Sequence, residues 1–118
     1  MIPAGVQVFV ALEPIDMRLG FERLSGWVRE HIGYDARSGA LYVFVGKRRE
    51  TLKVLFFDGS GMCIFAKRLD QGTFARLQAP SEGASHLEVD EATFDAMLDG
   101  IEVQPTSEAT RARPRRVH

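Results

Sequence analysis

Apolar runs alternate with short polar turns between residues 41 and 69, and this pattern predicts a three-stranded antiparallel meander. The runs cover Leu41 to Val45, Thr51 to Phe57 and Met62 to Ala66 and are rich in β-branched and aromatic residues. Asp58-Gly59-Ser60-Gly61 separates the last two, and Asp-Gly is a strong hairpin signal because glycine supplies the positive φ of a tight turn. Both faces of these strands are apolar, so we expect cover on both sides, from a second helix or from another subunit.

The chain before the meander predicts one strand and one helix. Val6 to Leu12 is an apolar run that ends at Glu13-Pro14. From Asp16 to Ile32, apolar residues recur every three or four positions, which predicts an amphipathic helix with Asp16 as its cap. Gly20 and Gly26 each lower helix stability by about 1 kcal/mol relative to alanine, so we expect the helix to depend on docking against the sheet.

The chain after the meander predicts two more strands and a helix. Thr73 to Leu77 and Leu87 to Val89 have strand-like patterns, and Asp90 is an expected N-cap for a short helix from Glu91 to Leu98 that stops at Gly100. The fold class we predict is therefore α+β. It has a mainly antiparallel sheet of four to six strands, one amphipathic helix packed on it and a short C-terminal helix.

Length and composition predict one domain with a tail. The chain has 118 residues, of which we assign 1–103 to a single domain and 104–118 to a disordered basic tail without apolar periodicity. No stretch approaches the roughly 18 apolar residues of a membrane span, and the start lacks the basic region of a secretory signal, so we expect a cytoplasmic protein without membrane contact. Cys63 is the single cysteine, which excludes an internal disulfide and a cysteine-based zinc pattern.

A net charge of −1 conceals a separation of charge along the chain. Residues 77–108 contain acids but no lysine or arginine, whereas bases gather in the meander and the tail. These bases are candidate phosphate contacts, since such cations displace counterions from nucleic acid. The candidates are Lys47, Arg48, Arg49, Lys53, Lys67, Arg68, Arg111, Arg113, Arg115 and Arg116. A purely structural role, in solvated loops and protected strand edges, stays open.

The acidic residues do not predict catalysis. A two-metal nuclease needs converging carboxylates, and Asp16, Asp58 and Asp70 are the ones to weigh. Each has a simpler role, because Asp16 precedes a helix and the other two begin turns, where a short carboxylate accepts local backbone N–H groups. We therefore predict no enzymatic activity, no metal and no cofactor. Arg18 faces an unfavourable helix dipole and needs a partner, which is Asp16 or Glu22 within the fold or a phosphate outside it.

Several motifs resemble those of one protein family when taken in order and spacing. They span about residues 2–102 and comprise Asp16-Met17-Arg18-x-Gly20-Phe21, Ser38-Gly39, Phe44, Gly46, Lys53-Val54-Leu55, Asp58-Gly59-x-Gly61 and Lys67-Arg68-Leu69. The pattern is similar to the TnpB-type (second-frame) accessory proteins of the insertion-sequence sixty-six family of bacterial transposable elements. The resemblance implies a small non-catalytic protein that assists DNA transposition. It also implies two partners, the transposase and a sister accessory protein of the same element.

The chain departs from this family pattern in two places. Relatives often carry tryptophan just before the Asp-Gly turn and an aromatic residue followed by proline after the Gly-x-Phe turn. Here those positions hold Phe56-Phe57 and Ala75-Arg76-Leu77. Either a shared binding surface is weakened in this protein, or phenylalanine replaces tryptophan in a core at modest cost.

Two functions fit these observations. In the first, the protein binds transposon DNA through its basic hairpin surface and tail. In the second, it is a protein–protein adaptor for the transposase or the sister accessory protein, without direct DNA contact, and its charges set specificity. A homo-oligomer is a further expectation, since a second subunit could cover the apolar sheet face.

Overall fold

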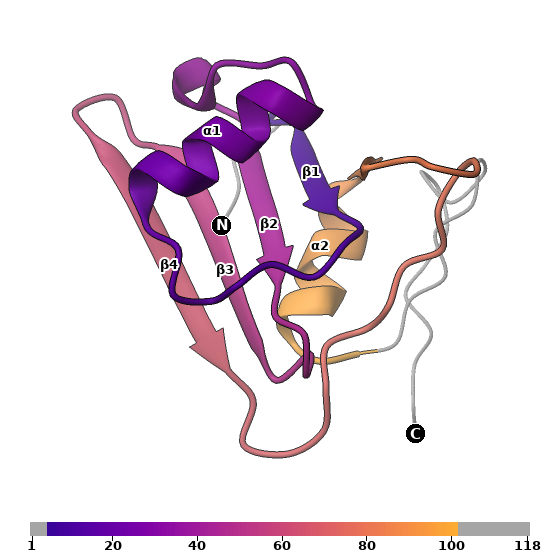
Figure 1. The fold of residues 1–118 in the computed structure, drawn as a ribbon. Helices are drawn as coiled ribbons and strands as arrows, with labels where there is room; N and C mark the ends of the chain where they lie inside the picture. Colours follow the sequence, from indigo (N-terminus) through magenta and orange to yellow (C-terminus); the bar gives the residue numbers. More distant parts are fainter. Residues whose placement is uncertain (1–4, 102–118) are drawn as a thin grey trace.

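A computed structural model describes residues 5–101 as one sheet of five strands with two α-helices (Figure 1). In chain order the elements are β1 Val8–Ala11, α1 Phe21–His31, a short 3₁₀ helix Ala36–Ser38, β2 Leu41–Val45, β3 Thr51–Phe57, β4 Met62–Arg68, β5 His86–Val89 and α2 Glu91–Leu98. The strand order is β4-β3-β2-β1-β5, and each neighbouring pair is antiparallel except β1 with β2. The predicted α+β class with a mostly antiparallel sheet is confirmed.

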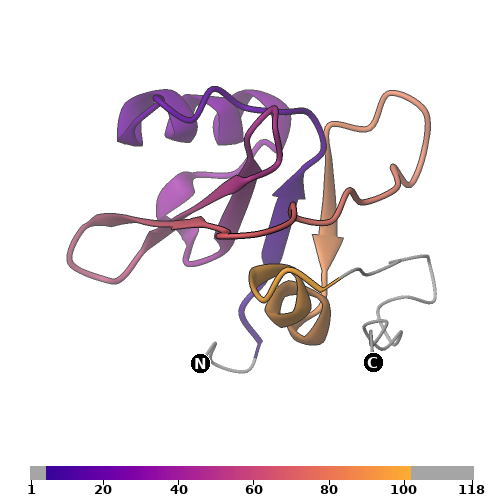
Figure 2. The ribbon, with the colours of Figure 1, turned by 90° about the horizontal axis from the view of Figure 1, so that it is seen from below.

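The central strands are buried on both faces. Along β2, Tyr42 and Phe44 belong to the core on the α1 side, whereas Val43 and Val45 belong to the core on the α2 side. Figure 2 shows the two helices on opposite sides of the sheet. Because side chains alternate between faces along a strand, a continuous apolar run needs cover from both sides. The chain itself supplies that cover over β1 and β2.

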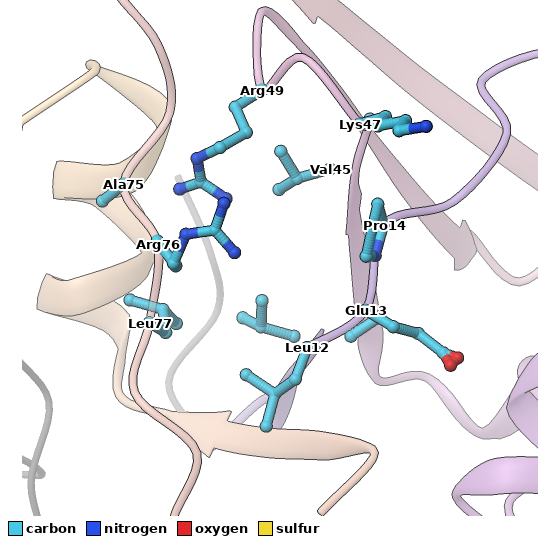
Figure 3. Close-up of a pocket in the computed structure, with 12 residues that line it drawn as sticks. Leu12, Glu13, Pro14, Val45, Lys47, Arg49, Ala75, Arg76 and Leu77 are labelled. Carbon is cyan, nitrogen blue, oxygen red and sulfur yellow. The ribbon is translucent and has the colours of Figure 1, made fainter.

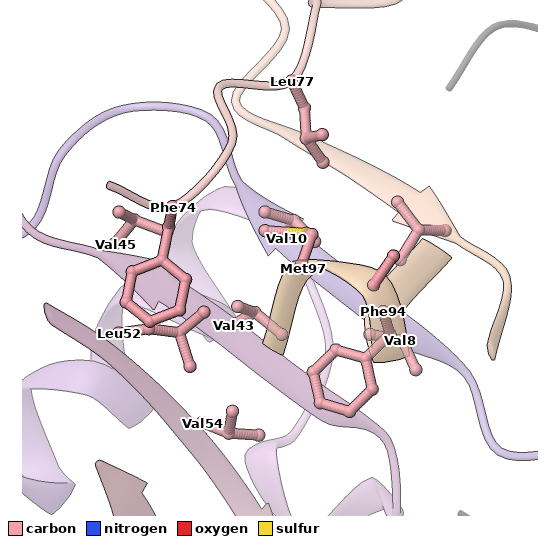
Figure 4. Packing of buried hydrophobic residues seen from close by; sticks show 12 residues of the cluster. Val8, Val10, Val43, Val45, Leu52, Val54, Phe74, Leu77, Phe94 and Met97 are labelled. Atoms are coloured by element: carbon pink, nitrogen blue, oxygen red, sulfur yellow. The ribbon is translucent and has the colours of Figure 1, made fainter. Parts of the chain in front are cut away.

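The core on the α2 side joins residues that lie far apart in the sequence. Met97 and Phe94 of α2 pack with Val43 of β2 and with Phe74 and Leu77 of the segment after β4 (Figure 4). The helix α2 begins at Asp90, whose carboxylate accepts a hydrogen bond of 2.8 Å from the Thr93 N–H. This cap fixes where the helix starts and therefore how its apolar side meets the sheet.

The first helix begins at Phe21, so the prediction that it starts at Asp16 is wrong. The Asp16 carboxylate accepts a hydrogen bond of 2.9 Å from the Arg18 N–H, and the Asp16 carbonyl accepts one of 3.0 Å from the Leu19 N–H. Gly20 follows in an extended conformation and is the N-cap of α1. A carboxylate that bonds to the backbone two residues later stabilises a turn instead of a helix, which explains the later start.

The predicted strand at Thr73–Leu77 is also wrong, because this segment is irregular. Its backbone is held at one point, where the Phe74 N–H donates to the Arg49 carbonyl over 2.7 Å. Phe74 and Leu77 are buried, and this anchoring through two side chains replaces a ladder of backbone hydrogen bonds. The alternating pattern of the sequence was therefore misleading.

The sequence also predicts a disordered tail and no membrane contact. The predicted tail, residues 104–118, lies outside the described residues. Within residues 5–101, no helix has the length and apolar character needed to cross a membrane.

Replacing Leu24 with alanine should destabilise the protein by about 2–5 kcal/mol, because the side chain is fully buried between α1 and the sheet. Phe21→Ala is a matched control on the same helix, since Phe21 is 49% exposed. Urea unfolding followed by circular dichroism measures both. Equal effects of the two changes would show that α1 does not depend on docking.

A candidate nucleic-acid interface at one end of the sheet

The turn between β2 and β3 places three consecutive basic residues at one end of the sheet. The Gly46 N–H donates to the Thr51 carbonyl (3.0 Å), and the Arg49 N–H donates to the Gly46 carbonyl (2.9 Å). Arg49 has a left-handed φ of 64°, which is uncommon for any residue other than glycine. Lys47 and Arg48 are exposed on this turn. The hairpin therefore presents two bases to solvent and turns the third toward the segment after β4.

Arg49 fastens that segment to the hairpin. Its guanidinium donates to the Phe74 carbonyl, 25 residues away in the sequence, while its own carbonyl accepts the Phe74 N–H. Burial lowers the pKa of Arg49, and the nearby positive charge of Arg76 lowers it further. An arginine remains charged at neutral pH even so. The site therefore holds a partly desolvated positive charge on Arg49, with the positive charge of Arg76 beside it.

Figure 3 shows the guanidinium groups of Arg49 and Arg76 side by side in a small pocket, with the Glu13 side chain pointing away from them. The pocket has a volume of about 30 Å³, and Lys47 also contributes to its wall. Arg76 was not among the predicted site residues. In the sequence its only mark is the departure from the family pattern at Ala75-Arg76-Leu77, because it meets Arg49 only through the path of the irregular segment.

A second, shallow pocket of about 210 Å³ joins the hairpin to the end of β4. Arg68 lines it together with the three hairpin bases. Arg68 also pairs with Glu50 at 3.8 Å, but both side chains are well exposed and the distance is long, so this pair holds Arg68 weakly. We call this surface the basic end; its members are Lys47, Arg48, Arg49, Arg68 and Arg76.

Two of the predicted contacts lie elsewhere and bond within the fold. The Lys53 ammonium donates to the Leu19 carbonyl (3.0 Å), in the loop before α1. The Lys67 ammonium donates to the Leu98 carbonyl (2.6 Å) at the end of α2, where a positive charge also suits the helix dipole. Both lysines therefore tie a helix or its approach to the sheet. The four tail arginines lie outside the described residues.

The family model described as IS66 Orf2 like protein matches residues 6–108 of this chain. The chain belongs to this family. The resemblance seen in its motifs is thereby confirmed, and a role as an accessory protein of IS66 transposition follows from it.

Two relatives of this chain come from Sinorhizobium fredii (strain NBRC 101917 / NGR234). The uncharacterized protein y4hO is 36% identical over 113 residues, which cover 94% of this chain and 96% of the relative. The uncharacterized protein y4jC is 30% identical over 113 residues, which cover 96% and 94%. No solved structure matches the chain.

Several residues of the family motif shape turns in this IS66 Orf2-like protein. Asp58 accepts hydrogen bonds from the Ser60 N–H (2.8 Å) and the Gly61 N–H (3.0 Å), and these bonds lower the pKa of its carboxyl group. Gly46 lies against Met17, and a Cβ atom there would be 2.8 Å from the Met17 Cγ atom.

Within residues 5–101, no three His, Cys, Asp or Glu side chains gather in an arrangement suited to a metal ion.

Arg18 forms an ion pair with Asp16 inside the fold, as one of the alternatives for its partner. Its guanidinium bonds to both carboxylate oxygens of Asp16, at 3.1 and 2.9 Å. The hydrogen bond from this guanidinium, followed by the one from the Arg18 N–H, lowers the pKa of Asp16 from 3.8 to about 2. The pair is exposed to solvent, so it shapes the turn at residues 16–19 more than it stabilises the whole protein.

In Arg18→Gln, the pKa of Asp16 should rise from about 2 toward 3.8, because the guanidinium bond is removed while the backbone N–H remains. A carboxyl carbon titration by NMR measures this. Since the folded pKa is the lower one, the contribution of this pair to stability is present above about pH 4 and is lost as the pH falls through about 2. Arg29→Gln, an exposed change on α1, is the control. An unmoved Asp16 pKa in Arg18→Gln would contradict the assignment.

Proposed function

We propose that this IS66 Orf2-like protein assists transposition by holding the phosphate backbone of DNA at its basic end. The observation that carries the proposal is the approach of the Arg49 and Arg76 guanidinium groups, which come from separate segments. Two like charges in a partly desolvated pocket repel each other. A phosphate oxygen bonded to both would offset that repulsion, and guanidinium groups bind phosphate with strong, directed hydrogen bonds.

The remaining bases of the basic end extend the same surface. Lys47 and Arg48 are exposed on the hairpin turn, and Arg68 adjoins them across a shallow pocket. Contacts to phosphates position a protein on DNA without reading its sequence. The proposal is therefore DNA binding with little sequence preference. The predicted tail arginines would add to it through their charge alone.

The alternative is the adaptor function, in which the partner is the transposase or the sister accessory protein. Exposed apolar side chains favour this alternative; they include Phe21 of α1, which is 49% exposed, and Phe65 of β4, which is 47% exposed. The salt dependence of binding distinguishes the two functions, because only DNA binding releases condensed counterions.

The double variant Lys47→Ala/Arg48→Ala should weaken binding to duplex DNA and reduce the slope of log affinity against log salt by about 0.9 for each phosphate that the variant no longer neutralises. Fluorescence anisotropy of a labelled duplex with the full chain, at several salt concentrations, measures both quantities. The fold should be unaffected, since exposed substitutions change stability by about 0.5 kcal/mol or less.

The matched control for that variant is Arg23→Ala/Arg29→Ala, which removes the same charge from the exposed side of α1. It should leave the slope nearly unchanged. An equal decrease in affinity in both double variants would mean that net charge alone governs binding. If the wild-type chain does not bind duplex at low salt but co-purifies with the transposase, the adaptor function replaces the proposal.

Arg76→Gln should separate a binding role from a structural one. It removes the charge beside Arg49 and keeps a polar side chain, so the thermal midpoint should stay the same or rise as repulsion is relieved. DNA affinity should fall in the same variant. A lowered midpoint with unchanged affinity would show that Arg76 supports the fold and does not bind phosphate.

A further inference from the structure

β4 is an edge strand, and among residues 5–101 no strand pairs with its outer side (Figure 1). The inner side is fixed by the hairpin. The Asp58 N–H donates to the Gly61 carbonyl (3.1 Å) at one end, and the Leu69 N–H donates to the Glu50 carbonyl (3.0 Å) at the other. Along an antiparallel ladder, alternate residues bond to the neighbouring strand. The backbone groups of the remaining residues therefore point outward; these are Met62, Ile64, Ala66 and Arg68.

This edge lacks the usual protection against pairing. Soluble proteins block edge strands with proline, a bulge or a lysine that points outward. The register between β3 and β4 is continuous from Thr51 and Arg68 to Phe57 and Met62, so no bulge interrupts it, and β4 contains no proline. Its one lysine, Lys67, donates to the end of α2. Among the outward-facing residues only Arg68, at the end of the strand, carries a charge, so within residues 5–101 the edge from Met62 to Ala66 is open to another strand.

An apolar groove on the α2 side of the sheet reaches this edge at Phe65. It has a volume of about 510 Å³ and lies mainly between the strands β2 and β3 and the helix α2. Phe65 lines it together with Phe56, Phe94 and Leu98. The helix α2 covers the centre of the sheet and leaves this part open. Exposed apolar surface of this kind, next to free backbone groups, marks a protein contact.

We propose that β4 of a second copy of this chain pairs with β4 in antiparallel orientation, centred on Phe65. In this register Met62 bonds to Arg68 of the second copy, and Ile64 bonds to Ala66 of the second copy. Every outward-facing backbone group of the strand is then used. The two Phe65 side chains lie directly opposite each other and close the open end of each groove.

Symmetry and charge favour a second copy as the occupant. An antiparallel pair of identical strands is two-fold symmetric, so one surface serves both subunits. The turn between β3 and β4, beside the first end of β4, contains Asp58, whose pKa is lowered by backbone N–H groups, and the other end of β4 carries Arg68. The antiparallel arrangement brings the acidic end of one copy near the basic end of the other, whereas a parallel arrangement would bring like charges together. The inference does not depend on DNA binding.

Sedimentation of the full chain without DNA, over a wide range of concentration, tests the dimer. Phe65→Lys should raise the dimer Kd about tenfold or more, since it places two like charges face to face. Phe21→Lys is the matched control, because Phe21 is 49% exposed and Phe65 is 47% exposed, and it should leave the Kd unchanged. Ala66→Pro removes an outward N–H and keeps the ladder with β3, so it should also yield a monomer with a near-normal thermal midpoint.

A cross-link tests the register. In a Cys63→Ser background, Phe65→Cys should form a disulfide-linked dimer under mild oxidant, because residues directly opposed across the two-fold axis have Cα atoms about 4.5 Å apart. Wild-type Cys63 should not cross-link, since it faces Lys67 of the second copy. A monomer at every concentration would overturn the proposal and leave the edge to a strand of a different protein. A dimer unaffected by Phe65→Lys and Ala66→Pro, or a cross-link through Cys63, would overturn it as well.

Discussion

The fold depends on burying both faces of the strands β1 and β2. Val8 and Val10 contact the core on one side, and Phe9 contacts the core on the other. A strand that is apolar on both faces is stable only between two layers. The two helices therefore have to lie on opposite sides of the sheet. The parallel pairing of β1 with β2 follows from this arrangement, since α1 crosses one face between these two strands.

Long basic side chains hold together parts of the chain that have no backbone ladder. Arg49 donates to the Phe74 carbonyl, Lys53 to the Leu19 carbonyl and Lys67 to the Leu98 carbonyl. Each bond satisfies a carbonyl at a loop or at a helix end, where backbone partners are lacking. Three basic residues of this protein are therefore structural ties and not simply surface charges. These bonds within the fold decide which basic residues remain available to bind a partner.

The basic end and the open edge of β4 meet at Arg68, so nucleic-acid binding and self-association would use neighbouring surfaces. The backbone of Arg68 lies on the free edge, and its side chain lines the pocket that also holds Lys47 and Arg48. A dimer through β4 would join two sheets into one and place the two basic ends at opposite ends of the joined strands. If the basic ends bind phosphate as proposed, the dimer would carry two such surfaces on one particle.

The sequence alone determined the α+β class, the apolar runs that became β2, β3 and β4, and the family, because these depend on local periodicity, turn chemistry and motif spacing. It could not determine the start of α1 at Phe21, since the bond from the Arg18 N–H to Asp16 competes with a helical pattern that continues through it. It also could not determine the irregular path of Thr73–Leu77. Burial of Phe74 and Leu77 under a helix formed later in the chain decides that path. Only the tertiary structure brought Arg76 to Arg49 and drew Lys53 and Lys67 into the fold, because a charge in a sequence has no partner until distant segments pack together.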